Sequence, residues 1–242
     1  MADLKAELAP RGVLRAGLNM SNFLLVTAGK AGAAPTGIVP DLAADIAARL
    51  GVGIEWVPYK DAGLLSAGSA GDAAKDEWDV AFMGAEPARA KVISFTPAYV
   101  EIEATYLVPA ESPIQALEDV DRPGVRIAVA ARAAYELYLT RTLKHAELVK
   151  AEGLDGSFRL FADQKLDALA GLRPKLIQDQ PQVPGSRVLP GRFTAIQQAI
   201  ATPAGRPAAF AFLQAYVQEL KAQGTVARLM ARHGVQGLAP TS

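Results

Sequence analysis

The residue types that most often carry catalysis or bind metal are scarce in this sequence. It contains no cysteine and only two histidines, His145 and His233, which lie far apart in the chain. Thiolate metal sites, cysteine nucleophiles and structural disulfides are therefore excluded. Two distant histidines also leave little material for a zinc site or a serine–histidine triad. We expect a protein that is not an enzyme and that needs no cofactor or metal.

Charge and composition narrow the class of protein further. Lysine plus arginine and aspartate plus glutamate number 25 each in 242 residues. A nucleic-acid-binding protein would need a basic surplus on one face, so no nucleic-acid partner is expected. Half of the residues are hydrophobic, which is enough for a sizeable core, and no apolar run has the length of a membrane span.

The N-terminal segment MADLKAELAPRG has neither a basic n-region nor an apolar h-region, so no signal peptide is visible. Two interpretations remain open. A leader was removed and Met1 replaces it, or the protein stays in the cytoplasm.

The elements that must position the polar side chains follow an α/β pattern. A β-branched and leucine-rich strand over 13–18 is closed by Asn19, a helix is expected over 41–51, and the next strand over 52–58. Strand, helix, strand is typical of a parallel α/β sheet. The further expected strands are 78–83, 125–130, 145–151 and 175–179. The further expected helices are a weak one at 62–75, then 132–143, 161–172, one from Pro207 to Gly224, and 225–234.

Two long extended runs, 99–110 and 192–202, separate these elements into two α/β groups. We expect them to be strands that cross between two lobes. Lobe 1 would comprise 1–103 and 198–242, and lobe 2 would comprise 104–197. Two lobes with a cleft between them favour capture of a ligand by hinge closure.

Several segments together resemble family-3 extracellular solute-binding proteins, which share the type II periplasmic-binding-protein fold. The segments are LRAGLN (14–19), GIVPDLAADIAARLG (37–51), WDVAFMGAEPARAKVISFTPAYV (78–100), GVRIAVAARAAYELYL (124–139) and the C-terminal FLQAYVQELKAQGTVARLMARHG. They cover nearly the whole chain in the family's order. The resemblance implies an α/β fold of two lobes, each a mostly parallel sheet flanked by helices, joined by two crossing strands.

The resemblance also implies a function. The chain would be the monomeric solute-binding component of an ABC-type uptake system and would work in the periplasm. Its partners would be a small ligand with a carboxylate, such as an amino acid or organic acid, and the membrane permease.

In such proteins an arginine holds the ligand's carboxylate, and the matching residue here is Arg89. The planar guanidinium fits a carboxylate through two parallel hydrogen bonds. Gly84 stands where a hydroxyl residue is common, so only its backbone could contact the ligand. Phe82 matches a position whose carbonyl accepts from the ligand amine. Glu86 replaces a common threonine, and it either adds a carboxylate to the site or complements a helix dipole.

In the second lobe the resemblance implies a Gly-Thr pair at a helix start, where free N–H groups bind the same carboxylate. Arg132 and Ala133 stand there instead, and Arg132 either selects ligands with extra negative charge or is a solvated side chain. Asp179 matches an aspartate that ends a strand and binds the ligand amine. It could equally form an Asx turn or a helix cap.

Asn19 and Asn22 match pocket positions where many members carry an aspartate and an aromatic residue. The aromatic residue is lost here, and Tyr59 could replace its ring, although a half-buried tyrosine at a sheet edge is as good an interpretation.

Three other functions stay open. The first is a lyase of the cyclohexadienyl dehydratase type, with Glu86 or Asp179 as general acid. The second is a ligand-sensing module that acts in trans. The third is a degenerate member that binds nothing tightly.

Overall fold

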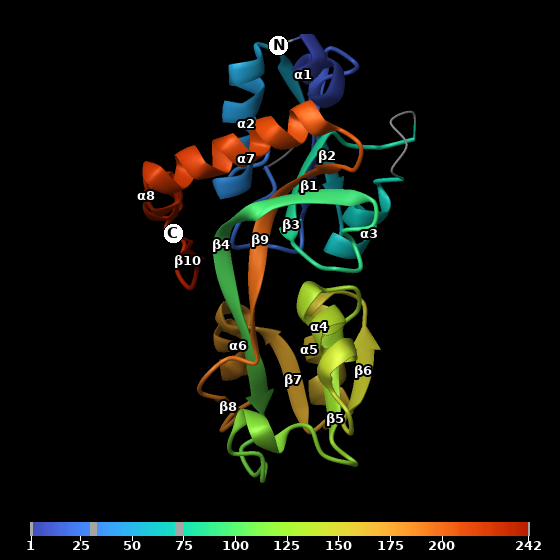
Figure 1. Ribbon diagram of the computed structural model, residues 1–242. Helices are drawn as coiled ribbons and strands as arrows, with labels where there is room; N and C mark the ends of the chain where they lie inside the picture. Colours follow the sequence, from blue (N-terminus) through green and yellow to red (C-terminus); the bar gives the residue numbers. More distant parts are fainter. Residues whose placement is uncertain (1, 30–32, 71–74, 242) are drawn as a thin grey trace. The chain divides into compact units, whose positions relative to one another are not determined.

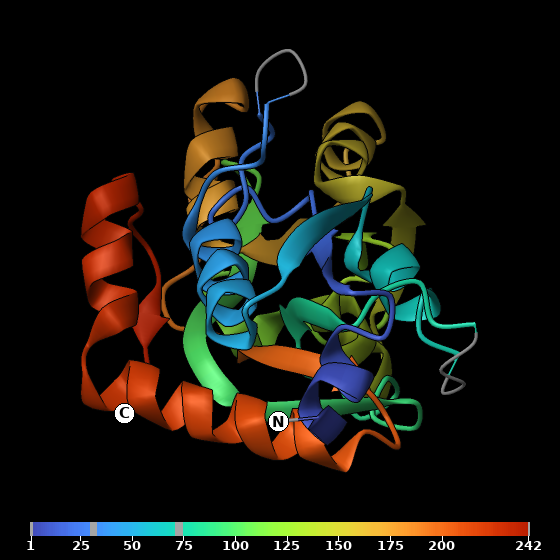
Figure 2. The same ribbon diagram turned by 90° about the horizontal axis from the view of Figure 1, so that it is seen from above.

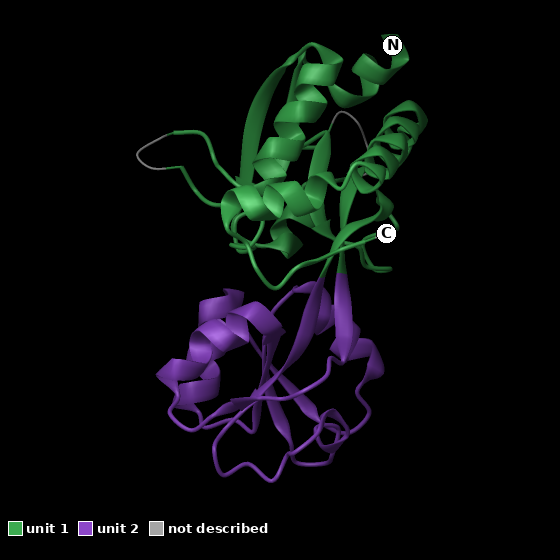
Figure 3. Ribbon diagram, turned by 90° about the vertical axis from the view of Figure 1, so that its left-hand side faces the viewer, with its two compact units in different colours: residues 1–101, 197–242 green, residues 102–196 purple. Residues whose placement is uncertain are grey.

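The computed structural model describes residues 2–29, 33–70 and 75–241. They form two compact units: unit 1 comprises 1–101 and 197–242, and unit 2 comprises 102–196 (Figure 3). The lobe boundaries expected from the sequence lie at 103/104 and 197/198. Each unit has its own hydrophobic core and is described by itself.

The sheet of unit 1 is mainly parallel. Strand β1 (Val13–Asn19) lies between β2 (Gly53–Tyr59) and β3 (Val80–Gly84) and pairs with both in parallel. The last part of β9 (Thr194–Pro203) runs antiparallel to β3. The helices described in this unit are α1 (Ala2–Leu8), α2 (Ile38–Leu50), α3 (Ala62–Ala67), α7 (Pro207–Ala222) and α8 (Thr225–His233). Figure 2 shows the long α7 in orange and α8 in red, turning away from it.

Helix α2 forms where its apolar spacing predicts it. Leu42, Ile46 and Leu50 recur at helical intervals and are all buried. The helix ends at Gly51, whose φ of 63° lies in the left-handed region that glycine adopts without steric cost. The expected weak helix over 62–75 is shorter than predicted, since α3 ends at Ala67 and residues 71–74 lie outside the described part.

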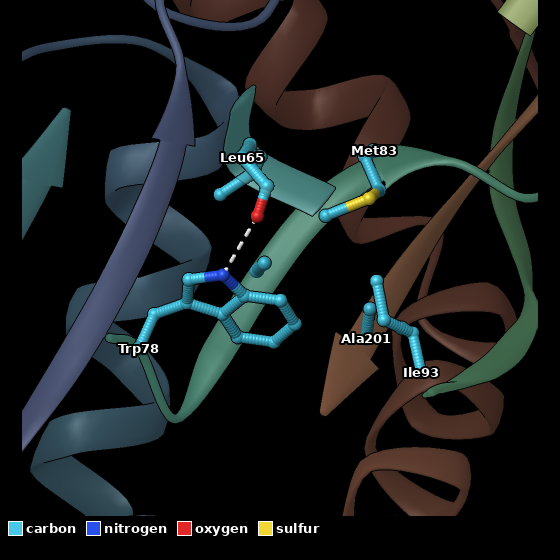
Figure 4. Packing of buried hydrophobic residues seen from close by; sticks show 6 residues of the cluster. Leu65, Trp78, Met83, Ile93 and Ala201 are labelled. Carbon is cyan, nitrogen blue, oxygen red and sulfur yellow. Dashed lines mark hydrogen bonds between the residues drawn. The ribbon is translucent and has the colours of Figure 1, made fainter. Parts of the chain in front are cut away.

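The core beneath β1 and β3 is built around Trp78. Its indole is fully buried, and its Nε1 donates a hydrogen bond of 2.8 Å to the backbone oxygen of Leu65 (Figure 4). Gly17 has to be small, because a Cβ there would lie 2.6 Å from Leu65 Cδ1. The other fully buried members of this cluster are Ala81, Met83, Ile93 and Ala201.

A network of four buried charges joins distant segments of unit 1. The guanidinium of Arg15 pairs with Asp79 at 2.7 Å and donates to the backbone oxygen of Asp76 at 2.7 Å. Arg206 bonds Asp79 at 3.0 Å and Asp76 at 2.9 Å, and it also donates to the backbone oxygen of Glu7. The hydrogen bonds that Arg15 donates to Asp79 outweigh the effect of burial and raise the pKa of Arg15. Two arginines and two aspartates thus balance in charge inside the unit.

Unit 2 has a second α/β sheet. Strand β5 (Arg126–Ala130) pairs in parallel with β6 (Glu147–Ala151) and with β7 (Ala168–Leu172). The helices are α4 (Ala134–Thr142), α5 (Gly153–Asp163) and α6 (Arg173–Asp179), and the short strand β8 (Arg187–Val188) pairs with β4 (Ile93–Val108). The fully buried cluster of its core comprises Leu107, Ala128, Phe161, Leu166, Leu169 and Leu176.

Two elements of unit 2 differ from the sequence prediction. The expected helix over 161–172 is wrong, because α5 ends at Asp163 and β7 (168–172) follows it. The run ALAGL contains strong helix formers, but all five residues are buried, and a continuous apolar run is typical of a strand covered on both faces. The expected strand over 175–179 is also wrong, since these residues belong to α6. Pro174 in the first turn of α6 was an available signal for a helix start.

Two long strands carry the chain from one unit to the other. Strand β4 (Ile93–Val108) leaves unit 1 and β9 returns to it, as the extended runs at 99–110 and 192–202 predict (Figure 1). The hydrogen-bonded order of strands is β2-β1-β3-β9-β4-β7-β5-β6. Strand β10 (Ala239–Pro240) pairs with β4 at Val100 and Glu101, so the C-terminal segment lies on β4 within unit 1.

Candidate functional site

The candidate site of unit 1 lies where its parallel strands end. Asn19 ends β1, Tyr59 ends β2 and Gly84 ends β3, and the register pairs Asn19 directly with Tyr59. Because parallel strands point the same way, these residues share one edge of the sheet. Ligands of α/β sheets bind outside this carboxyl edge.

Arg89 lies in the turn that follows β3. Its side chain is buried, and its Nη1 donates a hydrogen bond of 2.7 Å to the backbone oxygen of Gly84. The backbone N–H of Arg89 bonds the oxygen of Glu86 at 3.0 Å, which closes the turn. The structure therefore brings three predicted site residues together and fixes a buried positive charge at the end of β3.

The predicted residues Glu86 and Phe82 lie just after β3 and within it. Glu86 is buried in the same turn, where its backbone oxygen also accepts from Ala90. Phe82 is buried within the strand, opposite Ile200 of β9. Its ring meets the ring of Tyr99 edge to face at a centroid distance of 6.3 Å. The side chain of Phe82 thus belongs to the core, and only its backbone is a candidate for ligand contact.

The loop after β1 is a tight, hydrogen-bonded turn. The side-chain oxygen of Asn19 accepts from the N–H and the hydroxyl of Ser21 at 3.2 and 2.8 Å. The N–H of Asn22 bonds the backbone oxygen of Asn19 at 3.1 Å. The Oδ1 atom of Asn22 is buried and accepts no hydrogen bond from the residues that the structure describes. A buried acceptor without a donor is costly, which makes Asn22 a candidate for contact with a ligand N–H or a water.

The hydroxyl and the ring of Tyr59 both contact neighbouring residues of unit 1. Its hydroxyl donates to the carboxylate of Glu77, and its ring packs against the Trp78 core. Burial and the hydrogen bond to Glu77 both raise the pKa of Tyr59 well above its ordinary value. These contacts explain the position of the Tyr59 ring without any role in ligand binding.

In unit 2, Arg132 and Ala133 lie between β5 and α4. Arg132 has a φ of 64°, a left-handed conformation that is uncommon for a residue with a side chain. Its N–H donates to the buried carboxylate of Glu136 at 3.1 Å, and its guanidinium pairs with Glu152 at 3.1 Å on the exposed surface. Ala133 occupies the N-cap of α4 and has no side chain that could cap it. The cation expected to face a ligand thus has an acidic partner within its own unit.

Asp179 does not end a strand, as its sequence context predicts; it is the last residue of helix α6. Its buried carboxylate bonds Lys175 at 2.7 Å and Gln182 at 3.3 Å. The residue that ends a strand in this region is Leu172, which is apolar. Lys175 also pairs with Asp155 at 3.0 Å, and although burial lowers its pKa, the two carboxylates prevail and raise it.

Sequence reasoning passed over one residue at the edge of unit 1. Phe23 directly follows Asn22, and 39% of its surface is exposed. The sequence does contain a signal for this residue: an aromatic side chain in a polar turn after a strand is not needed for the core.

Within the described residues, no group of three or more histidines and carboxylates is arranged to hold a metal ion. The helices of the same part of the chain are too short or too polar to span a membrane.

Comparison with known proteins places these features in a family. Residues 14–236 match the sequence profile of the bacterial extracellular solute-binding proteins, family 3. No curated protein sequence matches the chain.

Solved structures share the fold over nearly the full length. An ancestral amino acid-binding protein, described as a precursor of cyclohexadienyl dehydratase, is 25% identical, with a TM-score of 0.74 over 93% of this chain and 96% of its own. ArgBP from T. maritima, in a mutant form, gives 22% identity and a TM-score of 0.75 over 96% and 98%. A binding component of an ABC transporter from Wolinella succinogenes, complexed with lysine, is 22% identical, with a TM-score of 0.74 over 92% of this chain and 95% of its own. The expected type II periplasmic-binding-protein fold is confirmed.

Proposed function

The chain belongs to the bacterial extracellular solute-binding proteins, family 3, and from this premise we propose that it captures an amino acid or a related small carboxylate. It would deliver this ligand to the permease of an ABC transporter, as a monomer outside the cytoplasm. Closure of the two lobes about the crossing strands, expected from the resemblance, remains part of this proposal.

The observation that carries the proposal is the buried guanidinium of Arg89. The bond to Gly84 fixes one nitrogen at 2.7 Å and so orients the planar group at the carboxyl edge of the sheet. An oriented guanidinium at this edge suits a ligand carboxylate through charge-assisted hydrogen bonds.

Replacement of Arg89 tests the proposal. We expect Arg89→Ala to weaken binding of a carboxylate ligand by about a hundredfold or more, since loss of a buried charged partner costs about 3 kcal/mol. Arg89→Lys keeps the charge but loses the planar fork, so it should bind with intermediate affinity. Isothermal titration calorimetry against the amino acids and small dicarboxylates measures the change.

The matched control is Arg49→Ala, because Arg49 is a half-exposed arginine of α2 that pairs with Glu219 away from the strand ends. It should bind as the unchanged protein does. Circular dichroism and thermal unfolding without ligand show whether each variant is folded. Equal affinity of folded Arg89→Ala and the unchanged protein would rule out the assigned role of Arg89.

An enzyme of the dehydratase type is the second candidate. It is favoured by the 25% identical ancestral protein, which is described as a precursor of cyclohexadienyl dehydratase, and by the buried Glu86 beside Arg89. Asp179 is a weaker candidate for the acid because Lys175 already binds it. Incubation with prephenate and arogenate decides the matter: turnover that is lost in Glu86→Gln supports the enzyme, and no turnover supports binding alone.

A further inference from the structure

Two buried amide side chains of unit 1 have an oxygen without a hydrogen-bond donor. The atoms are Oδ1 of Asn22 and Oε1 of Gln198, and neither accepts a hydrogen bond from the residues that the structure describes. The two residues are 6% and 4% exposed. A buried acceptor without a donor costs free energy, so each of these oxygens should meet a donor from outside the chain, either a ligand or a water.

The register of β9 places Gln198 beside the Arg89 turn. Gln198 is paired with Gly84, the last residue of β3, and residues paired in this way have Cα atoms about 4.5–5.5 Å apart. The backbone oxygen of the same Gly84 accepts the 2.7 Å hydrogen bond from Arg89. The N–H of Ala85 bonds the backbone oxygen of Gln197 at 2.8 Å, so β9 follows the chain into the turn. Gln198 and the guanidinium of Arg89 therefore both adjoin Gly84.

The two neighbouring glutamines of β9 lie on opposite faces of the sheet. Gln197 is exposed, and its Nε2 donates to the carboxylate of Glu101 at 2.8 Å. Successive side chains of a strand alternate, so that of Gln198 lies on the other face, which it shares with Ile200 and Phe82. Gln198 thus places a buried amide next to the apolar pair of Phe82 and Ile200, at the position closer to the end of β3.

Strand order puts the two acceptors on either side of β3. In the order β1-β3-β9, Asn22 follows the end of β1 and Gln198 belongs to β9 (Figure 1). The turn that carries Arg89 begins at the end of β3, between these two strands. A guanidinium only donates hydrogen bonds, and an amide oxygen only accepts them. Unit 1 therefore offers donors for a carboxylate beside acceptors for an N–H or O–H group.

We propose that Gln198 accepts a hydrogen bond from the ligand, so that the protein selects carboxylates with a donor beside the carboxyl group, namely 2-amino and 2-hydroxy acids. The proposal rests on the proposed function, because Arg89 supplies the carboxylate contact. Asp179, the expected partner of a ligand amine, is already paired with Lys175. Because the amide of Gln198 is uncharged, it recognises a hydrogen-bond donor and requires no positive charge.

The test compares ligands that differ only in this donor. One series is leucine, 2-hydroxy-4-methylpentanoate and 4-methylpentanoate, a second is glutamate, 2-hydroxyglutarate and glutarate, and a third is lysine and 6-aminohexanoate. Each is titrated by calorimetry into the unchanged protein and Gln198→Met, which keeps the length of the side chain but removes the acceptor. In the series that binds best, the amino and hydroxy acids should lose about tenfold in affinity in Gln198→Met, and the acid without the donor should change little.

Thermal unfolding without ligand gives a second measurement. Gln198→Met should unfold at the same or a higher temperature, because it removes an acceptor that lacks a donor within the chain. A lower unfolding temperature together with unchanged affinity ratios would show that Gln198 binds a structural water and would overturn the proposal.

The matched control is Gln197→Met, because Gln197 is the neighbouring glutamine whose amide is exposed and bound to Glu101. It should leave every affinity ratio unchanged. A ratio that survives in Gln198→Met but is lost in Glu86→Gln overturns the proposal, since it assigns the contact to that carboxylate. If Arg89→Ala abolishes binding while Gln198→Met keeps every ratio, only this inference fails. If no ligand of the panel binds or Arg89→Ala has no effect, the proposed function fails as well.

Discussion

The two units bury charge in different ways. In unit 1, Arg15, Asp76, Asp79 and Arg206 lie together, and each side chain is at most 5% exposed. In unit 2, the buried carboxylates of Glu136 and Asp179 pair with lysines whose side chains reach the surface. Lys150 is 48% exposed and Lys175 is 15% exposed.

The difference determines how far water can replace a partner that is lost. When a partner is lost in the unit 1 network, the remaining charge stays in a medium that solvates it poorly. When a lysine is lost in unit 2, water can reach the place of its ammonium group, and the buried carboxylate keeps a hydrogen bond from Thr140 or Gln182. Unit 1 should therefore depend on its network for stability, and unit 2 should tolerate the loss of a pair.

The largest effect is expected for Asp79→Asn. It leaves the shape of the side chain but puts two buried guanidinium groups against one carboxylate, which should lower the free energy of unfolding by about 3–5 kcal/mol. Urea unfolding followed by circular dichroism measures the loss. Glu219→Gln, which weakens the exposed pair with Arg49, serves as control and should change little. A loss below about 1 kcal/mol in Asp79→Asn would mean that the two units do not differ as described.

A smaller effect is expected for Lys175→Met in unit 2. Asp179 then keeps the hydrogen bond from Gln182, and the loss should be about 1–2 kcal/mol. Lys150→Met, at the more exposed pair with Glu136, should cost less than Lys175→Met. Hydrogen exchange of the β5–β7 amides, compared with those of β1–β3, shows whether the effect stays in unit 2. Equal losses for Lys175→Met and Asp79→Asn would contradict the comparison.

The smallest effect is expected at a surface carboxylate of unit 2 and depends on pH. Burial would raise the pKa of Asp121, but hydrogen bonds from the backbone N–H groups of Ala146, His145 and Lys144 prevail and lower it. A carboxyl whose pKa is lower in the folded state stabilises the fold above its unfolded pKa of about 3.9, and this is lost as the pH falls through the folded value.

Unit 2 should therefore lose protection of the 144–146 amides below about pH 4. Asp121→Asn should show the same protection at pH 3 and pH 6, because its side chain does not titrate. Hydrogen exchange at the two pH values measures this, and a pH dependence that survives in Asp121→Asn would assign the titration to another group.

The elements whose pattern is local were predictable from the sequence. Apolar spacing and Gly51 gave α2, and the extended runs gave β4 and β9. The strand at 168–172 was not predictable from the sequence, because alanine and leucine favour a helix. The five residues form a strand because all of them are buried, as in a strand that is covered on both faces.

The residues of the candidate site also fall into two groups, those whose partners are close in the chain and those whose partners are distant. The Arg89 turn is formed by neighbours in the chain, through its bonds to Gly84 and Glu86, so a local motif is enough to point to it. The partner of Arg132 lies 20 residues away on another strand end, and that of Tyr59 lies 18 residues away. No periodicity reveals such pairs, and none fixes how far the ring of Phe23 is exposed.

The connection through β4 and β9 also orders events during synthesis. Unit 2 is one continuous stretch, 102–196, so all of its strands and helices leave the ribosome before unit 1 is complete. Unit 1 has to wait for 197–242, which bring the β9 partner of β3 and Arg206. Until then the network holds one arginine, Arg15, and the two aspartates Asp76 and Asp79, so the nascent N-terminal segment carries an unbalanced acidic core. A growing chain should thus present a folded unit 2 and an open unit 1, and the arrival of 197–242 decides when unit 1 folds.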